Sequence, residues 1–109
     1  MKQLASMNIK FSYLYRDAGN YKNYGEVVFH NPNDLSFKEI EGLIRSKLIE
    51  GQWFVVKDWN LPDLHFDRYD EDLDHGWHEF EGISYTNDPV NSDISLEYFI
   101  KLIQEYDFK

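Results

Sequence analysis

The sequence predicts an α+β fold: an antiparallel sheet of four to five strands with two helices packed on one face, in the order β-β-α-β-(β)-β-α. Three observations favour this class. Aromatic-rich segments alternate apolar and polar residues, two other segments pair a helix cap with apolar residues at helical spacing, and Gly- or Asn-rich turns separate them. The 109 residues are expected to form a single domain, 1–109, long enough to build a core without disulfides or metal.

The first two predicted strands should form a hairpin. Asn8–Arg16 alternates aromatic or aliphatic residues with polar ones, which is typical of a strand with one buried face. Residues 17–25 are dense in Gly and Asn and predict a turn. Residues 25–30 predict the second strand, so the hairpin would carry a long aromatic loop.

The first helix has strong start signals. Ser36 and Glu39 have the spacing of a capping box, and Leu35 and Ile40 that of a hydrophobic staple. Gly51 is expected to end the helix as its C-cap.

The middle of the chain predicts strands that are less regular. Residues 53–56 form a short apolar run, expected to be a strand buried on both faces, and Leu64–Phe66 a short edge strand. The acid-rich residues 70–76 predict a loop. Residues 77–85 resume a strand-like pattern in which Gly82 indicates a bulge.

The last helix repeats the start signals of the first. Ser95 is the expected N-cap, and Ile94 and Phe99 have the spacing of a staple. The apolar stripe that should face the core consists of Leu96, Phe99, Ile100, Ile103 and Tyr106.

Acidic charge is concentrated in one segment. Residues 58–81 contain nine carboxylates against one arginine, a local charge of −8, whereas the whole chain carries −9. Such a concentration opposes compaction through self-repulsion unless a cation or a basic partner offsets it. The acidity also argues against nucleic acid or an anionic membrane as a direct partner.

Other function classes are excluded by what the chain lacks. It has no cysteine, and therefore no disulfide, Cys-ligated zinc or thiol nucleophile. No apolar run is long enough to span a membrane, and the first residues do not have the pattern of a signal peptide, so a cytoplasmic location is expected. Phosphate-binding loops and the G-x-S-x-G motif are also absent. No catalytic residue is predicted, and an enzymatic role is the less favoured interpretation.

A calcium loop is one interpretation of the acidic segment. Asp70, Asp72 and Asp74 take positions 1, 3 and 5 of an EF-hand loop, and Glu81 takes position 12. His75 stands where the sharp turn needs Gly, however, and helices are not expected on either side. A solvated acidic loop explains the same spacing.

A transition-metal site is the second interpretation, centred on the His/Asp cluster 65–79. Imidazole and carboxylate ligands suit zinc, manganese or iron, but the helical H-E-x-x-H context that fixes ligand geometry is missing. The alternative without a metal is that these histidines take up protons beside the carboxylates and partly offset the negative charge. Across both interpretations the candidate metal ligands are His65, Asp67, Asp70, Asp72, Asp74, His75, His78 and Glu81.

Protein recognition is the favoured interpretation. Aromatic side chains supply the contact area of binding hot spots, and carboxylates steer a basic partner toward them. The loop 15–24 has a similar Tyr- and Asn-rich composition. The expected partner-binding residues are Trp59, Tyr69, Asp70, Glu71, Asp72, Asp74, Trp77, Arg16, Tyr21 and Tyr24.

The strings YLYRDAGNYKNYGEVVF, LPDLHF and HGWHEFEGI resemble a group of small uncharacterised bacterial proteins that carry similar R-D-A-G-N-Y-K-N-Y-G and W-H-E-F segments. The similarity spans Lys10 to Ile103. Acidic proteins of this kind are often immunity or antitoxin partners of basic toxins, so the resemblance implies a compact bacterial domain of that type.

The sequence thus predicts a small acidic interaction domain, an inhibitor that binds a basic partner such as a toxin enzyme through residues 58–81. No cofactor is expected. The alternative is a metal-binding domain or metal-dependent enzyme that binds a divalent cation.

Overall fold

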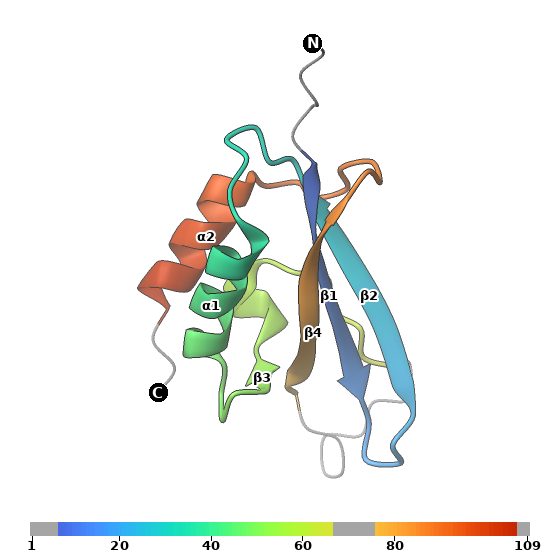
Figure 1. Cartoon of the computed structure of the whole chain (residues 1–109). Coiled ribbons are helices and arrows are strands. Elements are labelled where there is room, and N and C mark those ends of the chain that lie inside the picture. Colours follow the sequence, from blue (N-terminus) through green and yellow to red (C-terminus); the bar gives the residue numbers. More distant parts are fainter. Residues whose placement is uncertain (1–6, 67–75, 107–109) are drawn as a thin grey trace.

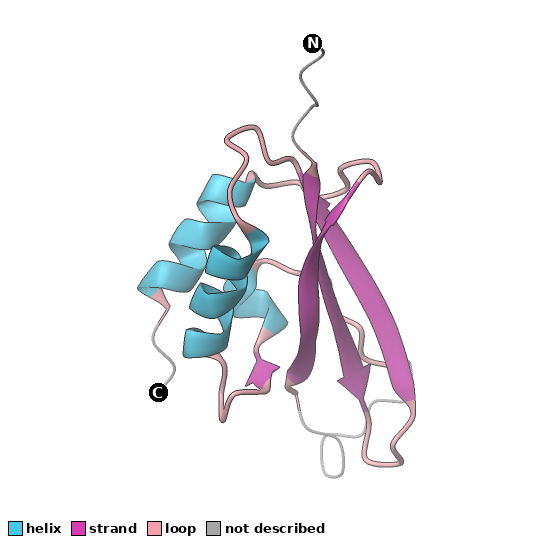
Figure 2. Ribbon diagram, in the orientation of Figure 1, coloured by secondary structure: helices cyan, strands magenta, loops and turns pink. Residues whose placement is uncertain are grey.

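The structure, a computed structural model, describes residues 7–66 and 76–106 (Figure 1). Its elements are β1 (Asn8–Arg16), β2 (Lys22–Phe29), α1 (Phe37–Lys47), β3 (Trp53–Phe54), the 3₁₀ helix η1 (Val56–Trp59), β4 (His78–Thr86) and α2 (Leu96–Glu105). The strands form one antiparallel sheet in the order β2-β1-β4-β3. Both α-helices lie on one face of this sheet (Figure 2), which confirms the predicted α+β fold.

The central strand β1 organises the core. Ile9, Phe11, Tyr13 and Tyr15 are buried at alternate positions, as the sequence pattern predicts. Phe11 lies at the middle of an aromatic cluster, with ring centroids at 5.2–6.4 Å from those of Tyr13, Phe54, Trp59, Phe80 and Phe99. Sheet and helices therefore share one continuous apolar core.

Residues 53–66 differ from the sequence prediction. Only Trp53 and Phe54 pair with β4, because the chain then turns into η1 and buries Val56 and Trp59. The Trp59 ring stacks on Phe54 at 4.8 Å with an interplanar angle of 13°. Leu64–Phe66 is not a strand either; these residues have no regular secondary structure, and Leu64 packs against the core. The strand predicted at residues 53–56 is thus confirmed only for Trp53 and Phe54, and the strand predicted at Leu64–Phe66 was wrong. Apolar runs this short do not distinguish a strand from a buried 3₁₀ turn or loop.

The bulge predicted at Gly82 is confirmed. On β1, the neighbours Ser12 and Tyr13 face Gly82 and Phe80 of β4, so Glu81 is the extra residue of a β-bulge. The shift keeps Phe80 and Ile83 buried on the core face while the exposed Glu81 points away from it.

The two helices start as predicted but cap differently. Ser95 accepts a hydrogen bond from the Tyr98 N–H, whereas Ser36 occupies the N-cap of α1 without a side-chain hydrogen bond, so the predicted capping box does not form. Helix α1 ends at Lys47 with Leu48 as C-cap, and not at Gly51. Gly51 instead adopts a φ of +74° in the turn that leads to β3.

The connection before α2 covers the outer edge of β2 at Val28. The backbone N–H of Val28 in β2 donates to the Asn91 side chain at 2.7 Å. In return the Val28 carbonyl accepts the N–H groups of Asn91 and Ser92.

Among the described residues, no helix combines the length and the apolar character that a bilayer crossing needs.

Candidate functional site

The candidate site is built on an irregular segment, residues 61–66, that lies against the core face of β1 and β2. The Tyr13 hydroxyl donates to the Pro62 carbonyl at 2.7 Å, and the Asn23 side chain donates to the Leu64 carbonyl at 3.0 Å. Gly25 allows this close approach, because a Cβ atom there would lie 2.9 Å from the Leu64 side chain. The segment is therefore held in place by side chains of the hairpin.

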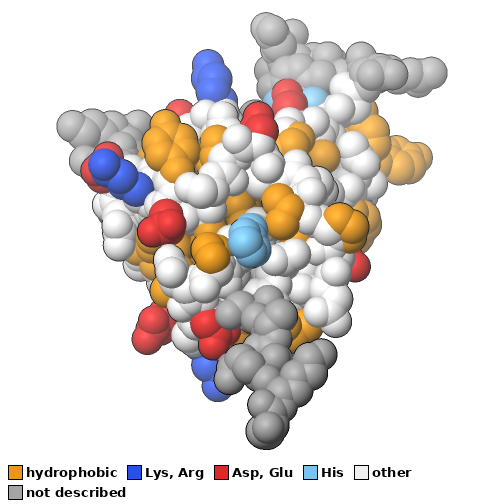
Figure 3. All heavy atoms as spheres, turned by 90° about the horizontal axis from the view of Figure 1, so that it is seen from above, with side chains coloured by type: hydrophobic (Ala, Val, Ile, Leu, Met, Phe, Trp, Pro, Cys, Tyr) orange, Lys and Arg blue, Asp and Glu red, His pale blue; other side chains and the backbone are white. Residues whose placement is uncertain are grey.

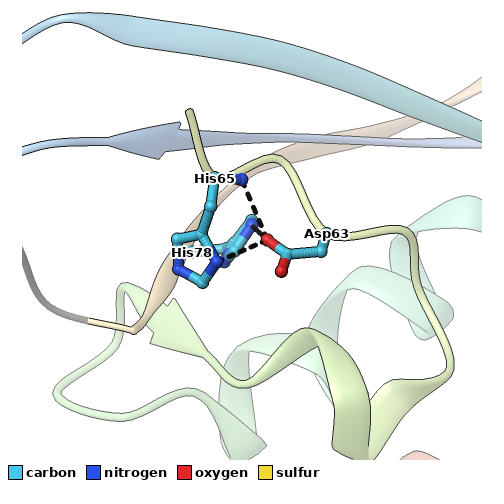
Figure 4. A group of neighbouring side chains, drawn as sticks. All are labelled: Asp63, His65 and His78. Atoms are coloured by element: carbon cyan, nitrogen blue, oxygen red, sulfur yellow. Dashed lines mark hydrogen bonds and ion pairs between the residues drawn. The ribbon is translucent and has the colours of Figure 1, made fainter. Parts of the chain in front are cut away.

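Three potential metal ligands meet at this segment: Asp63 and His65 from the segment itself, and His78 from the first position of β4 (Figure 4). Asp63 Oδ1 lies 2.7 Å from His65 Nδ1 and 3.5 Å from His78 Nε2. One ligand atom from each residue lies within 4.8 Å of the other two. The structure thus brings two imidazoles and one carboxylate to a common point.

Hydrogen bonds with the backbone orient this cluster. The Asp63 carboxylate accepts the backbone N–H of His65 at 2.8 Å, the local bond that Asp side chains form with a residue two positions on. The Leu64 N–H donates to His78 Nε2 at 3.0 Å. An imidazole nitrogen that accepts a hydrogen bond carries no proton, so His78 has its proton on Nδ1 if it is neutral.

The buried side of the cluster packs against an aromatic ring of β1, that of Tyr15. His78 is completely buried, and the ring of Tyr15 lies 4.4 Å from that of His65 and 5.1 Å from that of His78. The Asp63 side chain, by contrast, is 57% exposed. The site therefore has a buried side formed by the sheet and an open side at the carboxylate.

Two groups at the site have shifted pKa values. Partial burial raises the pKa of Asp63, but the hydrogen bonds and positive charge of His65, with a smaller contribution from His78, lower it by more, so the net pKa lies below the ordinary value. Burial raises the pKa of Tyr13, and the charge of Asp63 adds to the rise. Both shifts favour an ionised Asp63 beside a neutral Tyr13 hydroxyl.

The metal interpretations of the sequence are met only in part. Of the candidate ligands, the structure brings His65 and His78 together. Glu81 is exposed on the bulge of β4 and is not part of this group. The remaining candidates, Asp67, Asp70, Asp72, Asp74 and His75, lie outside the described residues, and with them most of the proposed calcium loop.

Sequence reasoning missed Asp63 as a candidate ligand, because it treated the carboxylate as part of the acidic run. The signal that could have found it is the D-x-H spacing of Asp63 and His65. That spacing is suited to a carboxylate that accepts the N–H two residues on.

The expected partner-binding residues lie in different environments. Trp59 has no exposed surface, so its prediction as a contact residue is wrong: its ring completes the core. Trp77 is partly buried and its ring lies 5.6 Å from that of Trp53. Tyr21 and Tyr24 are 71% and 60% exposed.

Arg16 is already bound within the chain. Its guanidinium forms two hydrogen bonds with the Glu79 carboxylate, at 2.7 and 3.3 Å, and a third with the Asn20 side chain at 2.5 Å. This bidentate pair ties the end of β1 to the start of β4. The other expected contact residues, Tyr69, Asp70, Glu71, Asp72 and Asp74, lie outside the described residues.

Tyr21 and Tyr24 lie at the same end of the sheet as residues 66 and 76, which flank the acid-rich residues 67–75 (the acidic stretch). Leu14 pairs with Glu79, so β4 begins beside the end of β1, from which the loop containing Tyr21 continues (Figure 1). The ring of Phe66 lies 6.2 Å from that of Tyr15. Residues 66 and 76, which flank residues 67–75, therefore both connect to this end.

A separate hollow of about 490 Å³ has Pro62 among its lining residues. It is lined by Val27, Lys57, Asn60, Leu61, Pro62, Asn91, Ser92 and Asp93. Its lining includes a basic side chain, Lys57, and an acidic one, Asp93, and none of the three clustered side chains contributes to it.

Comparison with protein-family models, with curated proteins and with solved structures finds no match to this chain.

Proposed function

We propose that this chain is a small acidic interaction domain that binds a basic protein, such as a toxin enzyme, and inhibits it by covering its anion-binding cleft. The observation that carries the proposal is the concentration of charge: residues 58–81 hold −8 of the net −9. A segment of this charge attracts a basic surface and accelerates encounter with it.

The exposed aromatic side chains support the same surface. Tyr21 and Tyr24 project from the loop and strand beside the ends of the acidic stretch. Exposed Tyr side chains supply contact area at a low entropy cost, and Tyr is enriched among binding hot spots. Carboxylates would then steer the partner, and the two tyrosines would hold it after contact.

The opposite end of the molecule has a different character. Figure 3 shows that end from above, where acidic and basic side chains are scattered among hydrophobic ones. Exposed residues there and on α2, such as Asp34, Glu97, Tyr98 and Glu105, offer matched control positions.

The test begins with affinity capture from the native host at low salt, followed by kinetics with the purified partner. Replacing Asp70 with Asn, Glu71 with Gln and Asp74 with Asn should slow association several-fold and flatten its dependence on salt. The control variant Asp34→Asn/Glu97→Gln/Glu105→Gln removes the same charge elsewhere and should change association less.

Tyrosine variants test the second step. Tyr21→Ala or Tyr24→Ala should speed dissociation by at least about tenfold if either is a hot spot, while Tyr98→Ala on α2 should have little effect. An acidic partner, or binding that is equally sensitive to the control variants, would disprove the proposal.

A further inference from the structure

We infer that Asp63, His65 and His78 bind one divalent transition-metal ion of the zinc class. The inference starts from their convergence: the three ligand atoms come from two separate parts of the chain and lie within 4.8 Å of one another. In Figure 4 all three side chains are turned toward a common point.

The separations suit a small ion. Zinc lies about 2.0–2.2 Å from nitrogen and oxygen ligands, which places tetrahedral ligand atoms about 3.3–3.5 Å apart. Asp63 Oδ1 is 2.7 Å from His65 Nδ1 and 3.5 Å from His78 Nε2. The 3.5 Å separation already has the required value, whereas the 2.7 Å separation must lengthen, and Asp63, the most exposed of the three side chains, has room to move.

The ligand set selects the class of ion. Two imidazoles with one carboxylate suit zinc, cobalt, nickel, copper or iron, whereas calcium and magnesium take oxygen ligands. Three protein ligands leave at least one coordination position for water or another molecule. The exposed carboxylate side of the cluster is where that position would open.

The scaffold limits how far the ligands can spread. His78 is buried in β4 opposite Phe54 of β3. The segment with Asp63 and His65 is fixed on both sides of the carboxylate by the Tyr13–Pro62 and Asn23–Leu64 hydrogen bonds. Neighbouring packing and hydrogen bonds of this kind orient the ligands of a metal site.

Binding exchanges two hydrogen bonds for coordination bonds. His78 Nε2 accepts the Leu64 N–H, so its lone pair already faces the segment, and that bond must give way to the ion. His65 Nδ1 is 2.7 Å from Asp63 Oδ1, which requires a proton between them. Coordination through Nδ1 moves this proton to Nε2 or releases it to solvent. Asp63 keeps its bond from the His65 backbone N–H, which orients the carboxylate.

The test is a titration of the untagged, metal-stripped full chain with Zn²⁺ and, in parallel, with Ca²⁺, by calorimetry. We expect saturable binding of one Zn²⁺ and no comparable binding of Ca²⁺. In NMR spectra the ring signals of His65 and His78 should shift with Zn²⁺, while those of the exposed His30 stay in place. No partner is present in this assay, so its result is independent of the proposed function.

Variants separate this site from the acidic stretch. Asp63→Asn and His65→Gln should each weaken Zn²⁺ binding by at least about 100-fold, because each removes a ligand. Asp58→Asn and His30→Gln are matched controls that should leave it unchanged. Asp70→Asn/Asp72→Asn/Asp74→Asn should also retain the site. His78→Gln replaces a buried ring, so its circular dichroism must be checked before its affinity is compared.

The inference fails if Zn²⁺ does not saturate at one ion per chain. It also fails if Asp63→Asn and His65→Gln bind as tightly as the wild type. Loss of binding in the Asp70/Asp72/Asp74 variant alone would assign the ion to the acidic stretch, and the three clustered side chains would then form only a hydrogen-bonded support for residues 61–66.

Discussion

At the scale of single residues, Asp63 links local chain geometry to the site. One oxygen of its carboxylate accepts the backbone N–H of His65 and lies within hydrogen-bond distance of the His65 ring. His78 approaches the same oxygen from β4 at 3.5 Å. These groups favour the ionised carboxylate and hold its pKa below the ordinary value against the effect of partial burial.

The lowered pKa predicts a dependence of stability on acid. A carboxyl whose pKa is lower in the folded state stabilises the fold above its unfolded pKa of about 3.9, and this contribution is lost as the pH falls through the folded value. The wild type should therefore lose stability relative to Asp63→Asn as the pH drops below about 4. Urea unfolding midpoints from neutral to acid pH measure this, and the effect should be small because the side chain is exposed.

Asp58→Asn is the control for this measurement, since it removes an exposed carboxylate of the same segment. If both variants change the acid limb of the stability profile equally, the interaction between Asp63 and the two histidines does not set the pKa.

At the scale of elements, two glycines on either side of the end of α1 show that backbone conformation, and not the space around the residue, decides whether substitution by Ala stabilises the fold. A Cβ atom at Gly42, within α1, or at Gly51, in the following turn, meets nothing within 4 Å. The two positions differ in backbone, because Gly51 has a φ of +74°. That region of φ is unfavourable for residues with a Cβ atom.

We therefore expect opposite results for the same change. Gly42→Ala should raise the free energy of unfolding by about 0.5–1 kcal/mol, because Ala loses less backbone entropy in a helix. Gly51→Ala should lower it by about 1–2 kcal/mol. Chemical denaturation of both variants measures the two changes, and an equal effect at the two positions would contradict the argument.

The elements that sequence predicted well are those whose signals are local. The alternation in β1, the starts of both helices and the bulge at Gly82 depend on neighbouring residues, and the structure has all of them. The turn of the chain at Val56 depends instead on the core cavity that Trp59 fills, which no local pattern reveals. The candidate site was predictable only in part for the same reason. Asp63 and His65 lie close to His78 because β4 pairs with β1 and β3 and because residues 61–66 pack against the β1–β2 hairpin.

At the scale of the whole molecule, the repulsion between acidic side chains opposes the stability that the apolar core provides. The core is continuous, but a net charge of −9 on 109 residues, concentrated in one segment, repels itself. Salt screens such repulsion between exposed charges, with a Debye length of about 8 Å at physiological ionic strength.

Replacing Asp70, Asp72 and Asp74 with Asn lowers the net charge from −9 to −6 and should raise the thermal melting temperature at low salt. The gain should shrink as salt is added, because screening already weakens the repulsion in the wild type. Melting curves at several salt concentrations measure both effects. A marked loss of stability would show instead that these carboxylates hold an ion or a network of hydrogen bonds.

The connection before α2 also bears on how copies of this protein behave at high concentration. The outer edge of β2 could template a strand from another molecule, and exposed edges of this kind promote aggregation. At Val28 the edge is already occupied, since both of its outward backbone groups bind Asn91 and Ser92. The other edge strand, β3, is two residues long and too short to recruit a partner. The occupied position at Val28 and the short β3 therefore both work against edge-to-edge pairing, which is the first step of fibril formation through strand edges.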